Sequence, residues 1–270
     1  VVLIFVAASS LWTPLFVSAA DSTRYGGEVV LSVGSDPKTF NDIVASETSS
    51  SVVTGVLFEG LTTVDPFTLK VIPNLARTWD VSADGLTWVF HLREHVKFFD
   101  GVPLTADDVV FTFNDIIYNP HIPSSSKDVL SVEGKPFKVE KIDDLTVRFI
   151  LPVKFAPFLR GMSQPILPKH KLSQAVAEGK FPFTWGINTP VHEIVGTGPF
   201  YLDQYRPGEQ LIFKRNPHYW KKDAEGNALP YLDRLAFLII ADSDARLLKF
   251  IDKELDYIAL RGNDYLLLKP

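Results

Sequence analysis

The sequence predicts a mixed α/β (α+β) fold, because stretches with strand patterning alternate with a stretch that has helical patterning. Residues 87–93, TWVFHLR, alternate strictly between two faces, as a half-buried strand does. Residues 105–118 place apolar side chains at helical spacing behind Thr105, a residue type that caps helices. Residues 235–240, LAFLII, are continuously apolar, which is typical of a strand covered on both faces. With 270 residues, of which 46% are hydrophobic, the chain can bury a substantial core.

Residues 1–20 have the pattern of a signal peptide. They carry no charged side chain, and the small residues at 18–20 suit a signal peptidase, so the mature chain is expected to begin at Ala20 or Asp21. A membrane anchor is the alternative, since the stretch approaches the roughly 20 residues that span a bilayer, but Pro14 and serines interrupt it. We expect a cleaved signal peptide over residues 1–20 and a soluble periplasmic protein. With no cysteine at the boundary, a lipoprotein is not expected.

The mature chain is expected to open with a strand over residues 28–33, followed by a polar stretch in which residues 48–51 start a helix. Residues 145–151 alternate in the manner of a strand. Residues 206–209, RPGE, fit a tight turn between two strands, with proline and glycine at its centre.

The last part of the chain predicts a strand–helix–strand unit. After the strand at 235–240, Asp242 or Ser243 caps a helix, and residues 257–260 return as a strand. Such a crossover implies parallel strands joined with right-handed sense. The apolar side chains expected on one side of the helix are Ala245, Leu248, Ile251 and Leu255.

Charge and cysteine content exclude several classes of function. The net charge is −5, and lysine and arginine are scattered, whereas nucleic-acid binding requires clustered positive charge. The absence of cysteine removes thiol catalysis and thiolate metal sites.

Three motifs resemble ion or nucleotide sites but lack an essential part. Residues 80–85 imitate the start of a calcium loop, yet His91 stands where the loop needs a glutamate. His91 and His95 have the spacing of zinc ligands on a helix, but His91 lies in an alternating strand, so the two do not converge. Residues 196–198, GTG, lack the remaining glycine and lysine of nucleotide-binding loops. The sequence therefore predicts no catalytic residue, no metal ligand and no cofactor.

Two long segments of the chain carry a specific set of motifs. Within residues 71–119 the motif positions are Leu75-Ala76, Trp79, Ser82, Asp84-Gly85, Leu92-Arg93, Lys97-Phe98, Asp100-Gly101, Leu104-Thr105-Ala106 and Asp108-Val109. Residues 195–220 hold a second block, in which GTGPF leads into RNP and YW. The two segments resemble a known family, the extracellular solute-binding proteins of family 5, which serve oligopeptide, dipeptide and nickel ABC importers. Residues 35–37 and 58–61 also match this family in kind.

The resemblance implies a periplasmic-binding-protein-like lobe I with an inserted subdomain. Members of the family resemble clamshells of two lobes plus a small extra domain, in much longer chains, so we expect an N-terminal fragment with the second lobe missing. Its expected parts are a first part of lobe I over residues 21–67, the inserted subdomain over 68–190, and the continuation of lobe I towards the hinge over 191–270.

The resemblance also implies a carrier that takes up oligopeptides or dipeptides in the periplasm and delivers them to the permease of an ABC importer, as a monomer and without nucleic acid. Because ligands of open α/β sheets bind beyond the carboxyl ends of strands, we expect contacts after the first strand and at the Phe58-Glu59 turn. The expected ligand-binding residues are Val33, Gly34, Ser35, Asp36, Phe40, Phe58 and Glu59. For Asp36, the alternative is a turn-forming role before Pro37.

Other interpretations remain open at this point. A related carrier for a nickel chelate, haem, a sugar oligomer or an opine would share the same motifs. A truncated product without function of its own is a further alternative. A hydrolase would require a nucleophile–base pair, and the sequence suggests none.

Overall fold

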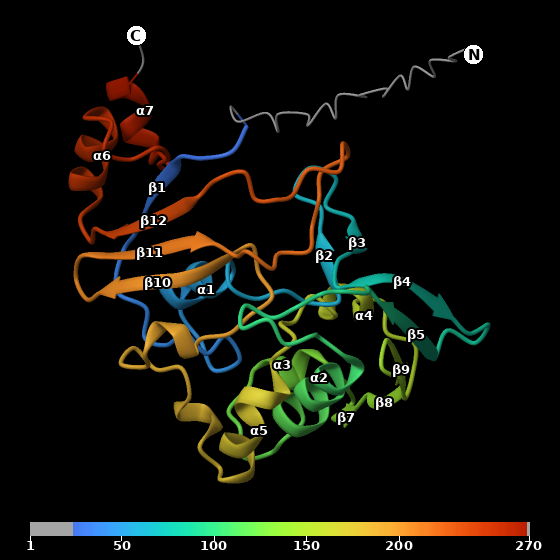
Figure 1. The fold of residues 1–270 in the computed structure, drawn as a ribbon. Helices are drawn as coiled ribbons and strands as arrows, with labels where there is room; N and C mark the ends of the chain where they lie inside the picture. Colours follow the sequence, from blue (N-terminus) through green and yellow to red (C-terminus); the bar gives the residue numbers. More distant parts are fainter. Residues whose placement is uncertain (1–23, 269–270) are drawn as a thin grey trace, which may run out of the picture.

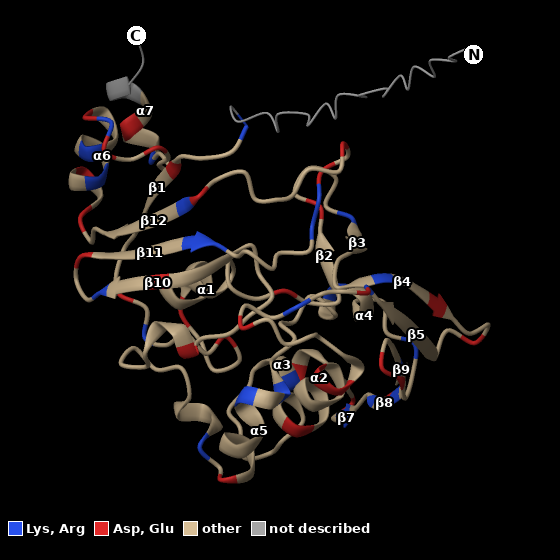
Figure 2. Ribbon diagram, in the orientation of Figure 1, with Lys and Arg blue, Asp and Glu red and all other residues tan. Residues whose placement is uncertain are grey.

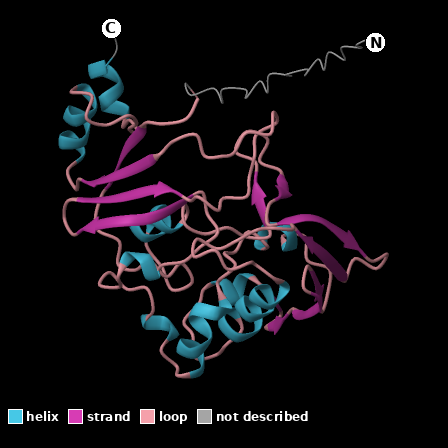
Figure 3. Ribbon diagram, viewed as in Figure 1, coloured by secondary structure: helices cyan, strands magenta, loops and turns pink. Residues whose placement is uncertain are grey.

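The computed structural model describes residues 24–268, so the expected signal peptide at residues 1–20 lies outside the described part of the chain. Two four-stranded sheets stand apart, and most helices gather between and below them (Figures 1 and 3). This arrangement is the mixed α/β architecture that the alternating sequence pattern predicts. Within residues 24–268, no helix has the length and apolar character needed to cross a membrane.

The first sheet joins the beginning of the described chain to its last third. Its strands lie in the order β1 (Glu28–Val33), β12 (Arg234–Ile239), β11 (Gln210–Arg215) and β10 (Phe200–Arg206). β1 and β12 are parallel, and the other pairs are antiparallel. The predicted turn at residues 206–209 joins β10 to β11, with Gly208 at φ 73°. The carboxyl ends of β1 and β12 therefore meet at one edge of this sheet.

The second sheet is wholly antiparallel and closes over an aromatic core. Its order is β4 (Ala76–Val81), β5 (Thr87–Leu92), β9 (Thr146–Ile150) and β8 (Lys138–Asp143). The predicted alternation of β5 is confirmed, since Phe90 and Leu92 are buried on the same face. Phe90, Phe149 and Phe158 contact one another with centroids 5.5 to 6.0 Å apart. Such tilted pairs add to the stabilisation from apolar burial.

The helix predicted over residues 105–118 is present, but its second half is wider than an α-helix. α2 (Ala106–Val110) continues directly into the π-helix η1 (Phe111–Ile117). The Asp108 carboxylate accepts hydrogen bonds from the N–H groups of Thr105 and Lys169, both at 2.9 Å. Asp108 therefore caps α2 and also holds the start of α5 (Lys169–Ala177) against it.

Shorter elements connect the two sheets. The helix expected to start near residue 48 is α1 (Thr48–Thr54). The remaining short elements up to the last strand are β2 (Thr62–Val64), β3 (Val71–Pro73), α3 (Ser126–Val129), β6 (Ser131–Val132), β7 (Lys135–Pro136), α4 (Phe158–Gly161), η2 (Phe181–Phe183) and η3 (Val191–Glu193).

The helix after β12 begins as predicted but buries a different face. Asp242 caps α6 (Ser243–Ile251) by accepting a hydrogen bond from the Ala245 N–H at 2.7 Å. The expected apolar side is wrong in part, because Leu248 and Ile251 are 61% and 50% exposed, whereas Leu247 is buried.

The return strand predicted over residues 257–260 does not form. The Asp256 N–H donates to the Val30 carbonyl at 2.9 Å, which is the first step of a strand pairing beside β1. The Asp256 carboxylate also accepts a hydrogen bond from the Val30 N–H at 2.7 Å. This side chain takes the place of the backbone carbonyl with which a neighbouring strand would bind the same N–H group. The chain instead leads into α7 (Gly262–Leu268).

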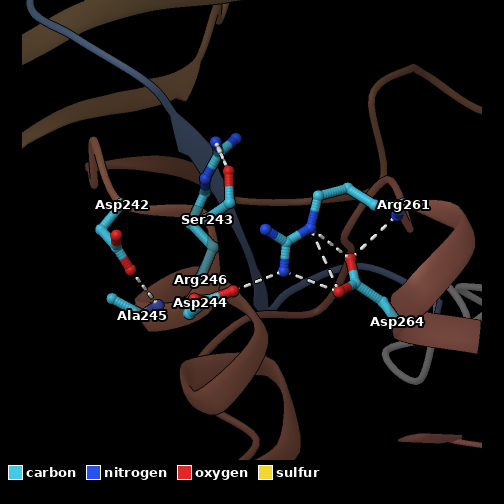
Figure 4. A network of polar contacts seen from close by, with 7 residues as sticks. All are labelled: Asp242, Ser243, Asp244, Ala245, Arg246, Arg261 and Asp264. Atoms are coloured by element: carbon cyan, nitrogen blue, oxygen red, sulfur yellow. Dashed lines mark hydrogen bonds and ion pairs between the residues drawn. The ribbon is translucent and has the colours of Figure 1, made fainter.

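An arginine joins the last two helices (Figure 4). The Arg261 guanidinium lies between Asp244 of α6, at 2.6 Å, and Asp264 of α7, at 2.7 Å. Asp264 is buried, and Arg261 also donates its backbone N–H to it at 2.8 Å. This network fixes the start of α7 beside α6.

Candidate binding site

A cavity of about 720 Å³ opens between two segments that are far apart in the sequence. One wall comes from the segment between β1 and α1, and the other from η2 and the loop that follows it. A volume of this size is typical of sites for small ligands. The cavity is lined by Lys38, Thr39, Val44, Ser46, Glu47, Pro123, Pro182, Phe183, Thr184, Gly186, Ile187, Asn188 and Thr189.

Asp36 anchors the start of the first wall to the first sheet. Its carboxylate accepts hydrogen bonds from the Tyr205 hydroxyl at 2.7 Å and from the Gly208 N–H at 2.9 Å. Phe40, which is fully buried, packs edge-on against the Tyr205 ring at 5.5 Å. The loop after β1 is thus fixed to the β10–β11 hairpin, which gives the cavity a rigid support.

Glu47 lines the cavity, yet its carboxylate is engaged within the wall. It accepts hydrogen bonds from the backbone N–H groups of Lys38 and Ser46, each at 3.2 Å, and from the Ser50 hydroxyl. Burial raises the pKa of Glu47, but these hydrogen bonds outweigh that effect and hold the pKa below its ordinary value. The carboxylate is therefore ionised at neutral pH and satisfied by its own loop.

Trp185 holds the second wall against the first. Its backbone has φ 53°, a left-handed conformation that is rare for a bulky residue. Its carbonyl accepts the Phe40 N–H at 2.8 Å, and its indole N–H donates to the Glu193 carbonyl at 3.0 Å. The indole also stacks on Phe58, with centroids 5.4 Å apart and planes 17° apart. Contacts on three sides thus maintain a backbone conformation that costs free energy.

The carboxyl group of Glu59 is buried and is not part of the cavity lining. Its carboxylate accepts hydrogen bonds from the Tyr219 hydroxyl at 3.1 Å and the Trp220 indole N–H at 2.9 Å. Burial raises the pKa of Glu59 above its ordinary value, and these hydrogen bonds offset only part of the shift. The Arg93 guanidinium, directly after β5, lies 4.6 Å from the centroid of the Trp220 ring. Trp220 therefore connects Glu59 with the end of a strand of the second sheet.

Residues 70–268 match the family model described as "Bacterial extracellular solute-binding proteins, family 5 Middle". The chain belongs to this family. The family is one of solute-binding proteins and not of enzymes, in agreement with the sequence-based expectation.

Three relatives of this solute-binding protein show how the fold is used elsewhere. "Di/tripeptide-binding protein 4" of Pseudomonas aeruginosa is 34% identical over 80% of this chain, which spans 40% of the relative. The oligopeptide-binding protein AppA of Bacillus subtilis, solved with a nonapeptide, is 27% identical with a TM-score of 0.75, and the match covers 90% of this chain and 46% of AppA. MelB of Agrobacterium fabrum, solved with stachyose, is 25% identical with a TM-score of 0.77, over 90% of this chain and 38% of MelB. The chain spans less than half the length of these relatives.

None of the residues predicted to bind ligand lines the cavity of the solute-binding protein. Gly34 and Ser35 are exposed at the carboxyl end of β1, whereas Val33, Phe40 and Phe58 are buried. Asp36 and Glu59 each have two hydrogen-bond donors inside the protein. Ligand contact by these seven residues stays a prediction.

Sequence reasoning missed the residues that do line the cavity. Thr39 and Gly186 form an isolated β-bridge across it, although 147 positions separate them in the numbering. The one local signal is the cluster at residues 48–51, which follows Ser46 and Glu47 of the lining and predicts only a helix start.

The cavity lining suits reversible binding of a polar solute. The lining combines hydroxyl groups and an amide with proline and aromatic surface. Lysine and arginine are scattered over the part of the chain that the structure describes (Figure 2). Within residues 24–268, no group of three histidine or acidic side chains is arranged to hold a metal ion.

Proposed function

We propose that the complete protein containing this chain captures peptides outside the cytoplasm and delivers them to the permease of an ABC importer. The cavity carries the proposal, because its hydroxyl, amide and backbone groups match the donors and acceptors of a peptide main chain. The similarity to a di/tripeptide-binding protein and to peptide-bound AppA supports the same ligand class. We expect a monomer that releases its peptide unchanged.

A second candidate is an oligosaccharide. The similarity in fold to stachyose-bound MelB favours it, and a lining of hydroxyl groups, an amide and an aromatic ring can bind sugars as well as peptides. The two candidates differ in the chemistry of the captured molecule and can be separated directly.

The decisive experiment is mass spectrometry of the ligand released from the complete protein purified from its host. Peptide masses, together with calorimetric binding of a defined dipeptide at about 1 μM or tighter, are expected. Recovery of a sugar oligomer or a nickel chelate, with no heat on peptide addition, would reject the peptide assignment.

We also propose the domain boundaries that the sequence predicts, and the pairing of the strands supports them. All strands of the first sheet come from residues 28–33 and 200–239, on either side of the expected subdomain at 68–190. All strands of the second sheet come from residues 76–150, inside it. We propose that residues 21–67 and 191–270 build lobe I around this insertion.

A further inference from the structure

Lys38 is a free cation at the cavity. Its backbone N–H bonds to Glu47, but within residues 24–268 its ammonium group makes no ion pair. The other charged group of the lining, the Glu47 carboxylate, accepts hydrogen bonds from two N–H groups of its own loop and from the Ser50 hydroxyl of α1. Lys38 is therefore the charged group of this lining that is left to pair with a solute, because the Glu47 oxygens already accept hydrogen bonds from the protein.

Lysines on the neighbouring surface differ from Lys38 in this respect. Lys180 Nζ lies 2.7 Å from the Glu178 carboxylate, and Lys171 Nζ lies 3.9 Å from the Asp100 carboxylate. Both lysines line smaller hollows that share Phe183 with the cavity. Because their charges are balanced by acids of the protein, Lys38 is the better partner for an anionic group of a solute.

Phe183 supplies an apolar surface to the same cavity. Its side chain is 83% exposed, although it is a large aromatic residue, and it also lines the two adjoining hollows. Phe183 belongs to η2, and Trp185 two residues later is buried and fixed through Phe40, Phe58 and Glu193. The anchor at Trp185 thus keeps Phe183 at the mouth of the cavity.

We infer that Lys38 and Phe183 determine the specificity of the site together, by selecting a solute that carries both a carboxylate and an apolar or aromatic group. Lys38 pairs with the carboxylate, and Phe183 packs against the apolar group. This inference rests on the proposed function and narrows it to peptides with a free carboxyl terminus near an apolar side chain.

The test uses the complete protein and three synthetic probes, namely Ala-Phe, its C-terminal amide and Ala-Ala, with calorimetric Kd values. Wild type should bind Ala-Phe about tenfold more tightly than the amide. Lys38→Gln should weaken binding of the free acid and bring the ratio close to one, and Lys38→Arg should preserve most of the ratio. Phe183→Ala should weaken Ala-Phe about tenfold and Ala-Ala much less, and Phe183→Tyr should retain binding.

Two exposed residues elsewhere provide matched controls. Lys70→Gln removes an exposed lysine, and Phe67→Ala removes an aromatic ring that is 92% exposed, both on the β2–β3 connection and outside this cavity. Neither should change the Kd of any probe. Unchanged melting temperatures establish that the site variants fold.

The possible failures can be told apart. If wild type binds peptides but does not distinguish acid from amide, and both site variants bind like wild type, the inference about Lys38 and Phe183 is wrong while the proposed function stands. If wild type binds none of the peptides, the proposed function fails and this inference fails with it.

Discussion

The indole N–H of Trp220 donates a hydrogen bond to the Glu59 carboxylate at 2.9 Å, across 161 positions of the sequence. Tyr219 donates to the same carboxylate at 3.1 Å. The sequence predicts Glu59 as a ligand contact. The two hydrogen bonds show that its side chain also stabilises the fold. Separate measurements of stability and affinity can therefore define its role.

Glu59→Ala should lower the free energy of unfolding by about 2 kcal/mol, because the Tyr219 hydroxyl and the Trp220 indole N–H lose their acceptor in a buried place. Denaturant unfolding of the purified protein measures the change. Glu94→Ala is the control, since the Glu94 side chain is 61% exposed, and it should change stability little. Equal effects of the two substitutions would contradict the structural role.

The raised pKa of Glu59 predicts a pH dependence of stability. A carboxyl group whose pKa is higher in the folded than in the unfolded state favours folding in its protonated form. Its stabilising effect is complete below the ordinary value of 4.5 and disappears as the pH rises through the folded-state pKa. Glu59→Gln should flatten this part of the stability profile, measured by unfolding between pH 4 and pH 8. A profile with the same slope in the variant would show that another group titrates there.

Asp36→Ala and Tyr205→Phe should be non-additive, because the two side chains share one hydrogen bond. Each single change should lower the free energy of unfolding by about 1 kcal/mol, and the double variant should lose less than the sum. The sequence-based hypothesis instead expects Asp36→Ala to weaken ligand binding without lowering the melting temperature. Melting curves and affinities of the same variants in the complete protein distinguish these outcomes.

Gly196→Ala should destabilise the fold strongly, by about 3 kcal/mol. A Cβ atom at Gly196 would lie 2.0 Å from the Leu57 carbonyl oxygen, so one backbone segment would have to move away from the other. Gly262→Ala is the matched control, since a Cβ there meets no atom within 4 Å. Thermal unfolding of both variants is the measurement, and a Gly196→Ala protein that melts like wild type would contradict this close approach.

Asp108→Ala should destabilise the subdomain, because one carboxylate serves two helix starts. The N–H groups of Thr105 and Lys169 would lose their acceptor, at a cost of about 1–2 kcal/mol in the free energy of unfolding. The neighbouring Asp107→Ala removes two partly exposed ion pairs, with Lys141 and Lys169, and should cost much less. Hydrogen exchange at residues 106–117 and 169–177 would locate the loss.

Features of the fold whose causes lie within a few neighbouring residues can be predicted from the sequence alone. The alternation of β5 decides which face of that strand is buried, and the Asp242 carboxylate reaches the Ala245 N–H only three positions away. The Pro-Gly turn between β10 and β11 is equally local. The family motifs indicate the right family for the same reason, because they consist largely of such capping, turn and packing residues.

Features that depend on contacts between residues far apart in the sequence become visible only in the folded chain. The Asp256 carboxylate ends a strand pairing by binding Val30, 226 positions away, and no local pattern shows this. The hydrogen bond from the Phe40 N–H to the Trp185 carbonyl joins the two walls of the cavity, one of which carries Lys38 and the other Phe183. Hydrophobic periodicity and capping depend on residues within a single turn or strand. A binding site forms where segments far apart in the sequence come together, and packing of the whole core determines which segments meet.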